Sequence, residues 1–104
     1  MIMVAALATL ITTAQVTTSS ISGVVKTADG QPIEGASLVA VHTPSGTQYS
    51  TLAKKGGVFT LPGLRTGGPY TLKITFTGLK VETVNDIYLL LGEPYVINPT
   101  LIDE

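Results

Sequence analysis

The sequence has no cysteine and no tryptophan, and few of its residues are charged. Without cysteine the chain can form neither a disulfide framework nor a cysteine-ligated metal site, and it offers no thiol for lipoprotein acylation. Charged residues make up 12% of the chain, with 6 basic against 7 acidic. This balance supplies no positive stripe for a phosphate backbone, so we expect no nucleic-acid partner.

Side chains suited to catalysis or metal binding are equally sparse. The only histidine is His42, and no second histidine or recognisable serine or carboxylate motif accompanies it. General-base catalysis needs a partner that faces the substrate, so we interpret His42 as a polar residue at a strand end. The carboxylates are scattered over expected turns and strand ends, which does not favour acid–base or calcium chemistry. We therefore expect no enzymatic activity, no cofactor and no metal.

The one long apolar run lies at the N-terminus. Residues 1–14 carry no charge and are too few to span a bilayer as a helix, which takes about 20 residues. Small residues at Thr12 and Ala14 provide a cleavage point before Gln15, so we interpret the run as a secretory signal peptide. The basic residues that usually precede such a run are missing. The alternative is an N-terminal strand or a buried helix of the domain itself.

The remainder is expected to form one domain at residues 21–102, joined to the leader by a short polar tether at residues 15–20. Strand signals follow one another at intervals of about 8 to 12 residues, a spacing typical of sandwiches and barrels. Apolar residues nowhere recur with helical periodicity over an ordinary helix length. The sequence predicts an all-β fold with seven strands, near residues 20–26, 36–42, 48–53, 58–61, 69–76, 82–90 and 95–101.

The clearest alternation lies in the fifth of these strands. Apolar side chains at Tyr70, Leu72, Ile74 and Phe76 alternate with polar ones such as Lys73, which predicts one buried face and one solvated face. We expect this strand to be central in its sheet.

Turn residues mark the connections between the strands. Asp29-Gly30 supplies the first turn, and residues 54–57, with two glycines, are expected to close a hairpin. Glycine-containing turns on both sides of Leu64 indicate a short connector that buries this leucine while Arg65 faces water.

Short motifs follow one another in order along the chain: Gly23-x-Val25, Asp29-Gly30-x-Pro32-Ile33-x-Gly35-Ala36, Thr43 with Gly46, Gly57-x-Phe59-x-Leu61-x-x-Leu64 and Gly68-x-Tyr70-x-Leu72-x-Ile74. Together they resemble the carboxypeptidase regulatory-like domain, and the resemblance covers about residues 20–102. It implies a seven-stranded transthyretin-like (prealbumin-like) β-sandwich with Greek-key connections. Two positions depart from the family pattern: Gly56 stands where an aspartate is usual, and Leu79 follows Gly78 in place of an aromatic residue.

Two segments carry a narrower resemblance. Thr-Pro-Ser-Gly at residues 43–46 and Leu-Arg-Thr-Gly-Gly-Pro-Tyr at residues 64–70 are similar to the copy of this domain at the N-terminus of Oar-like TonB-dependent outer-membrane receptors. The resemblance implies a non-catalytic accessory domain for nutrient uptake, exported to the periplasm or to the periplasmic side of the outer membrane. The implied partner is a protein of the transport system, either the receptor's own barrel or a periplasmic energising component. Membrane association would come only through a barrel, which these 104 residues are too few to form together with the domain.

The alternative function is a free-standing secreted module that binds carbohydrate or acts as an adhesin. Sugar platforms usually need exposed aromatic faces, and Tyr88 and Tyr95 flank the turn at Gly92. We favour the interpretation that these two tyrosines form a cross-strand pair that stabilises a sheet.

The last expected strand is a candidate binding edge. Pro99 cannot donate to a sheet hydrogen bond and is tolerated far better in an edge strand than in a central one. An edge strand can recruit an extended segment of a partner, and the residues proposed for this role are Tyr95, Val96, Ile97 and Asn98. The alternative is that Pro99 only protects this edge against aggregation.

Overall fold

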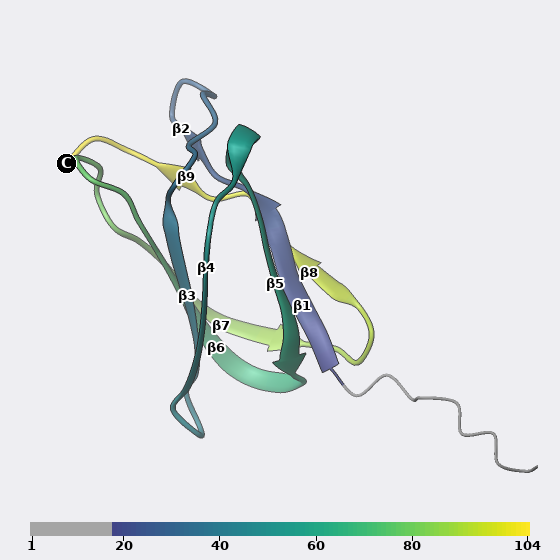
Figure 1. Cartoon of the computed structure of the whole chain (residues 1–104). Helices are drawn as coiled ribbons and strands as arrows, with labels where there is room; N and C mark the ends of the chain where they lie inside the picture. The colour runs from purple at the N-terminus through teal and green to yellow at the C-terminus, as the bar shows by residue number, and fades with distance from the viewer. Residues whose placement is uncertain (1–17) are drawn as a thin grey trace, which may run out of the picture.

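The computed structural model describes residues 18–104, which fold almost entirely into β-strands joined by short turns (Figure 1). The expected signal peptide at residues 1–14 and the first part of the expected tether lie outside the described residues. The described elements are β1 (Thr18–Val24), β2 (Lys26–Thr27), β3 (Ser37–His42), β4 (Thr47–Leu52), the 3-10 turn η2 (Lys55–Gly57), β5 (Val58–Arg65), β6 (Gly67–Thr75), β7 (Glu82–Leu89), β8 (Pro94–Val96) and β9 (Thr100–Leu101). Within residues 18–104, no helix has the length and apolar character needed to cross a membrane.

The strands form two main layers (Figure 1). One sheet has the order β4-β3-β6-β7 and the other the order β5-β1-β8, while the short strands β2 and β9 pair at one end. β3 is antiparallel to β6, and β1 is antiparallel to β5, although neither pair is consecutive in the sequence. Such non-sequential neighbours are what Greek-key connections produce. The predicted all-β sandwich is therefore confirmed.

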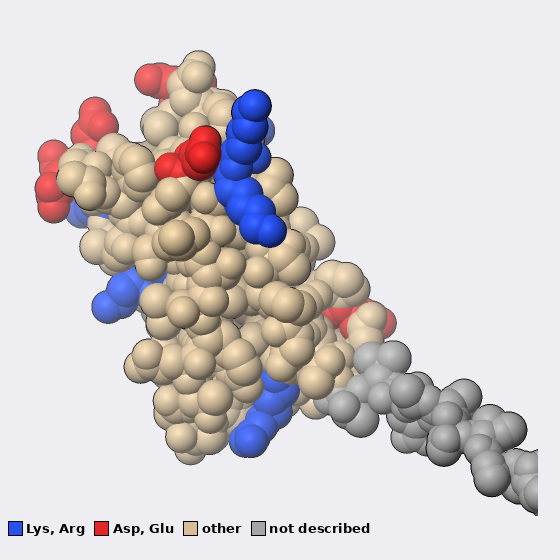
Figure 2. Space-filling model, in the orientation of Figure 1, with Lys and Arg blue, Asp and Glu red and all other residues tan. Residues whose placement is uncertain are grey.

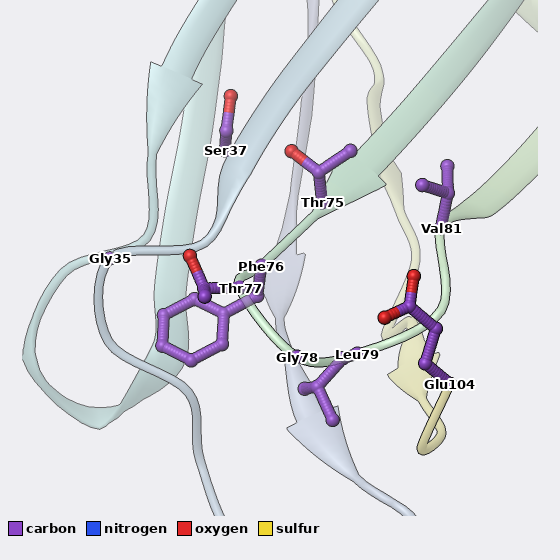
Figure 3. A pocket seen from close by; sticks show the side chains of 9 residues that line it. All are labelled: Gly35, Ser37, Thr75, Phe76, Thr77, Gly78, Leu79, Val81 and Glu104. Atoms are coloured by element: carbon purple, nitrogen blue, oxygen red, sulfur yellow. The ribbon is translucent and has the colours of Figure 1, made fainter.

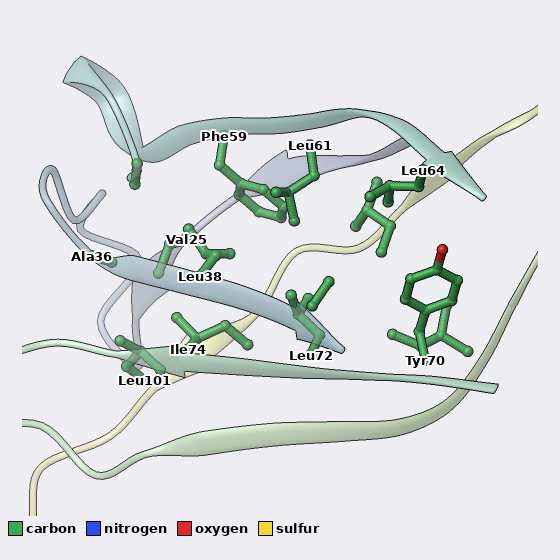
Figure 4. Close-up of a cluster of buried hydrophobic side chains, with 14 of the residues drawn as sticks. Val25, Ala36, Leu38, Phe59, Leu61, Leu64, Tyr70, Leu72, Ile74 and Leu101 are labelled. Atoms are coloured by element: carbon green, nitrogen blue, oxygen red, sulfur yellow. The ribbon is translucent and has the colours of Figure 1, made fainter. Parts of the chain in front are cut away.

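Alternating side chains of the two sheets meet to form the core (Figure 4). In β6, Tyr70, Leu72 and Ile74 are fully buried while Lys73 is exposed, as the alternation predicted. β6 also lies between β3 and β7, so its predicted central position is confirmed. The opposite sheet contributes Ile21, Phe59, Leu61 and Leu64.

Phe76 is a correction to the predicted core. Its side chain is 38% exposed, because β6 ends at Thr75 and the chain turns away from the sheet at that point. The strand period places a residue on the buried face only while the chain remains extended. Phe76 belongs instead to the loop between β6 and β7.

Two predicted strands are each divided, which gives nine strands within residues 18–104 instead of seven. The first is interrupted at Val25, whose N–H donates to the Gly57 carbonyl at 2.8 Å and whose carbonyl accepts from the Ile33 N–H at 2.9 Å. Val25 is therefore bound by two loops in place of a neighbouring strand. β1 also begins at Thr18, so residues 18–20 of the expected tether belong to the sheet.

The last predicted strand is divided between β8 and β9. β8 pairs in parallel with β1, and β9 pairs in parallel with β2. Between β8 and β9 the Asn98 side-chain oxygen accepts a hydrogen bond from the Val24 N–H at 3.0 Å. In a continuous sheet, a backbone carbonyl of the neighbouring strand would accept this hydrogen bond. Pro99 itself is buried, and its carbonyl accepts from the Lys26 N–H at 3.1 Å.

Residues 54–57 do not close a hairpin, contrary to the prediction. They form η2 and carry the chain from β4 in one sheet to β5 in the other. Gly57 has a φ of +78°, and a Cβ there would lie 2.4 Å from the Val25 carbonyl oxygen. Only glycine permits this approach of the two backbones. Leu64 is buried and Arg65 is exposed, as expected, although both belong to a longer β5.

Candidate functional site

The connection between β7 and β8 forms a shallow groove at an open side of the sandwich. The groove has a volume of about 200 Å³ and is lined by Tyr88, Leu90, Glu93, Pro94 and Tyr95. We call these five residues the β7–β8 groove. β7 and β8 are the outermost strands of the two different sheets, so the groove lies between two sheet edges.

Hydrogen bonds to β1 hold this connection in place. The Gly92 N–H donates to the Thr18 carbonyl at 3.1 Å, and the Ser19 hydroxyl donates to the Glu93 carbonyl at 2.6 Å. The Glu93 N–H donates to the Leu90 carbonyl at 3.2 Å and closes the turn. The backbone of the groove is therefore held by hydrogen bonds that do not involve its apolar side chains.

Several large apolar side chains in and next to the groove residues are exposed. Tyr88 is 59% exposed, Leu90 62%, Leu91 59% and Val96 66%. Single exposed apolar residues are common on protein surfaces, whereas a cluster around a groove marks an interaction site. These four exposures identify the β7–β8 groove as the candidate site.

The predicted cross-strand pair of Tyr88 and Tyr95 is wrong. Tyr88 lies on β7, which pairs with β6, and Tyr95 lies on β8, which pairs with β1. Cross-strand stabilisation requires neighbouring strands of one sheet, and these strands belong to different sheets. The two tyrosines instead both line the groove.

Charge is distributed unevenly along the chain. Lys80 is the last basic residue, and residues 81–104 contain five carboxylates and no lysine or arginine. β7, β8 and β9 all belong to this acidic part of the sequence. On the face drawn in Figure 2, Lys and Arg side chains lie in small separate groups, and no continuous positive stripe forms.

The strand that the sequence proposed as a binding edge does lie at an edge. Tyr95 and Val96 are in β8, the outer strand of its sheet, and Ile97 and Asn98 follow it. The Ile97 N–H donates to the Ser22 carbonyl at 2.9 Å, so the N–H of Val96 faces away from β1. Pro94, the next outward position, has no N–H. β8 therefore offers an incoming strand very few donors, and its recruitment of a partner stays a prediction.

A second hollow, of about 470 Å³, lies at the loop between β6 and β7 (Figure 3). Ser37, Thr75 and Thr77 supply hydroxyl groups, Phe76 supplies an aromatic ring, and Glu104 is the one ionisable side chain in its lining. A lone carboxylate has no second group with which to share a proton. The lining of this hollow therefore lacks the pair of ionisable side chains that acid–base catalysis needs.

His42 has a partner that the sequence analysis missed. Its Nδ1 lies 2.6 Å from the Ser45 hydroxyl, which is also within 2.9 Å of the Thr47 hydroxyl. The three-residue spacing of His42 and Ser45 across the expected turn is the sequence signal that could have predicted this contact. His42 is only 6% exposed, and none of the hydrogen bonds within residues 18–104 links it to a carboxylate. The pair caps the turn between β3 and β4 and lacks the orienting acid of a catalytic triad.

The Tyr70 hydroxyl closes the turn between β5 and β6. It donates to the Arg65 carbonyl at 2.7 Å, and its ring packs edge-on against His42 at 5.1 Å between centroids. Burial raises the pKa of Tyr70 to about 12, and the adjacent Tyr49 adds to the rise. A buried phenol that donates to a backbone carbonyl is stabilised in its neutral form, so Tyr70 serves the structure.

Metal-binding sets are missing from the part of the chain that the structure describes. In residues 18–104, no three His, Cys, Asp or Glu side chains lie close enough together to hold a metal ion.

The comparisons with known proteins agree with the fold. The family model of the carboxypeptidase regulatory-like domain matches residues 20–102. No curated protein sequence matches the chain significantly.

Similar solved structures come from several classes of protein. They include a chain of a type II cohesin-X-dockerin complex from Acetivibrio cellulolyticus (18% identity, TM-score 0.63, covering 80% of this chain and 56% of that one). Catechol 1,2-dioxygenase from Acinetobacter radioresistens matches at 13% identity and a TM-score of 0.65, covering 86% and 53%. The dioxygenase domain of a dioxygenase and carbohydrate-binding fusion from Streptomyces sp. SirexAA-E matches at 17% identity and a TM-score of 0.63, covering 91% and 86%. The chain spans little more than half of the first two, and identities this low show a shared fold alone.

Proposed function

Because this chain belongs to the carboxypeptidase regulatory-like family, we propose that it is a non-catalytic interaction module, the periplasmic accessory domain of a TonB-dependent outer-membrane receptor. The observation that carries the interaction role is the β7–β8 groove, where the large apolar side chains of Tyr88 and Leu90 are exposed beside a hollow of about 200 Å³. An ordered apolar surface of this kind suits binding, since it needs no rearrangement before a partner arrives.

The receptor context is supported by the two segments that resemble Oar-like receptors. They meet at one end of the sandwich, where the Thr43 N–H and hydroxyl both donate to the Pro69 carbonyl, at 3.1 and 3.0 Å. His42 and Tyr70 are register partners on β3 and β6 directly behind this contact. The receptor-like motifs thus form one structural unit that closes the sandwich.

In this role the domain acts outside the cytoplasm. The apolar leader at residues 1–14 would direct export, and the domain would reside in the periplasm or against the periplasmic side of the outer membrane. Its partner would be the receptor's own barrel or a periplasmic component that energises transport. The β7–β8 groove would serve as the docking surface for such a partner, and transport itself would belong to the receptor.

Export is the first test of this proposal. A reporter enzyme that is active only in the periplasm, fused after Glu104, should be active with residues 1–14 present and inactive when they are deleted. Mass spectrometry of the exported protein should place its N-terminus at Gln15. A reporter that stays inactive in both fusions would contradict the periplasmic role, whatever the domain binds.

The receptor context has a separate test. The reading frame that continues downstream should encode a plug-like segment and a barrel, with its many repeated strands of alternating hydrophobicity. A stop codon directly after Glu104 in the genome would contradict the receptor assignment and leave a free-standing module.

A carbohydrate-binding module is the second candidate, because Tyr88 presents an exposed aromatic ring beside Tyr95 in the groove. A glycan array separates the two proposals. Binding of a glycan that Tyr88→Ala abolishes would favour the carbohydrate module, whereas an array without binding would favour the protein-interaction role.

A further inference from the structure

We propose that the C-terminal half of β7, together with the β7–β8 groove, binds an extended segment of a partner protein in which apolar and basic residues alternate. This inference rests on the proposed interaction role and names the surface and the chemistry of the partner. It moves the candidate binding edge from β8, where the sequence analysis placed it, to β7.

β7 has the free backbone that strand addition requires. It is the last strand of its sheet, and no strand within residues 18–104 pairs with its outer side. It is eight residues long, whereas β8 has three and begins with a proline. An extended segment added to β7 would gain main-chain hydrogen bonds along the strand.

A bulge confines the docking site to one half of this strand. The register with β6 shifts between Val84 and Ile87, and Asp86 has a φ of +58°. Such a bulge bends the strand and interrupts a straight edge. Residues 82–84 are thereby separated from residues 87–89, and it is the latter that lead into the groove.

The groove accepts an apolar side chain from the incoming segment. Tyr88 and Tyr95 both line a hollow of about 200 Å³, together with Leu90, Glu93 and Pro94. Side chains of an added strand point alternately to the two faces of the sheet, so every second residue would point toward the groove. An apolar residue at that position would cover Tyr88 and Leu90, which are 59% and 62% exposed.

Charge selects the kind of partner. Asp86 directly precedes the docking half of β7, Glu93 lines the groove, and no lysine or arginine occurs from residue 81 to the end of the chain. The basic residue that the sheet brings closest to the Gly92–Glu93 turn is Arg65 of β5, the register partner of Thr18, whose carbonyl accepts from the Gly92 N–H. Lys73 lies inside the other sheet, opposite Thr83 and away from the groove. A segment with basic residues beside its apolar ones would place opposite charges next to these carboxylates.

A second copy of this chain fits the same edge less well. Antiparallel pairing of residues 87–89 with the same residues of another copy would bring the Asp86 carboxylates of both chains into one interface, without a basic residue from either strand. Like charges across neighbouring strands are unfavourable. The carboxylates therefore oppose self-association and favour a basic segment.

The test uses two synthetic peptides that differ only in charge: one alternates Lys and Val, and the other alternates Glu and Val. Titrated into the isotope-labelled chain, the Lys peptide should shift the amide resonances of residues 87–89 and of the groove, and its affinity should fall with added salt. The Glu peptide should bind at least about tenfold more weakly. Tyr88→Ala should raise the Kd of the Lys peptide about tenfold or more, as expected for a central aromatic contact.

Two further variants make the test specific. Glu93→Gln should weaken the Lys peptide and reduce its salt dependence. Leu52→Ala is the matched control, because Leu52 is 60% exposed on β4, the opposite edge of the same sheet, and its loss should leave the Kd unchanged.

Several outcomes would overturn the proposal: equal binding of both peptides, shifts confined to β4 or β8, no binding at all, or self-association through β7 in sedimentation experiments without peptide. The export assay is independent of all of these. A chain that is exported but does not bind the Lys peptide would refute this surface and leave the proposed function standing.

Discussion

Replacement of Tyr70 by phenylalanine tests whether its hydroxyl is a structural element of the fold. The ring stays, so packing against His42 and the core is retained, while the 2.7 Å hydrogen bond to the Arg65 carbonyl is lost. Removal of one partner from a buried hydrogen bond costs about 1–3 kcal/mol, because the other partner is left without a substitute. We expect Tyr70→Phe to lower the free energy of unfolding at neutral pH by about 1–2 kcal/mol.

The same variant should also change how stability depends on alkaline pH. Tyr70 has a pKa raised to about 12 in the folded chain, against 10.0 for an ordinary tyrosine, mainly because burial disfavours the phenolate. Below pH 10 both states keep the proton, and the contribution of Tyr70 does not change with pH. Between pH 10 and 12 the unfolded chain loses its proton first, so the native protein loses stability as pH rises. The loss is about 1.4 kcal/mol at pH 11 and about 2.7 kcal/mol in full.

Urea unfolding followed by far-UV circular dichroism at pH 7, 9, 10, 11 and 12 measures both effects. The stability difference between the native chain and Tyr70→Phe should be largest at pH 7 to 9 and should shrink or reverse by pH 12. Tyr88→Phe is the control at neutral pH, since Tyr88 is 59% exposed, and it should change stability by less than about 0.5 kcal/mol. A difference between native chain and Tyr70→Phe that is the same at every pH would refute the assignment of a raised pKa to a buried Tyr70.

Three further predictions concern packing and the backbone. Leu72→Ala, at a fully buried site in β6, should cost about 2–5 kcal/mol in urea unfolding, against less than about 0.5 kcal/mol for the exposed neighbour Lys73→Ala; equal losses would mean that the faces of β6 are assigned wrongly. Phe76→Ala should cost clearly less than Leu72→Ala, because Phe76 is 38% exposed in a loop, and a loss as large as that of Leu72→Ala would place its ring in the core after all. Gly57→Ala should destabilise the fold more than Gly63→Ala. Both glycines have a positive φ, but a Cβ at Gly57 would lie 2.4 Å from the Val25 carbonyl oxygen, while a Cβ at Gly63 would meet nothing within 4 Å. Thermal unfolding of both variants gives the comparison, and similar losses of stability would show that only the positive φ matters.

The functional surface was only partly predictable. The sequence favoured a cross-strand pair of Tyr88 and Tyr95, which is wrong, and it placed an edge at residues 95–98, of which Tyr95 and Val96 lie in the outer strand β8. The sequence could not show that β7, before the Gly92 turn, and β8, after it, belong to different sheets. A short connection between two strand signals usually closes a hairpin, so local patterns favour pairing. Hydrogen bonds from the connection to Thr18 and Ser19 of β1 decide against it.

The amino-acid sequence by itself determined the strand content, the buried face of β6 and the burial of Leu64, because alternation and turn residues act over a few neighbouring positions. Tertiary structure alone decided where the strands break and which strands are neighbours. Val25 leaves the sheet because its backbone is bound by the Ile33 loop and by Gly57, which is 32 residues further along the chain. Phe76 leaves the core because β6 ends one residue earlier. The alternation of side chains along a strand shows which face of the sheet each one occupies. Which strands pair, and where each strand ends, depends on contacts between segments far apart in the chain.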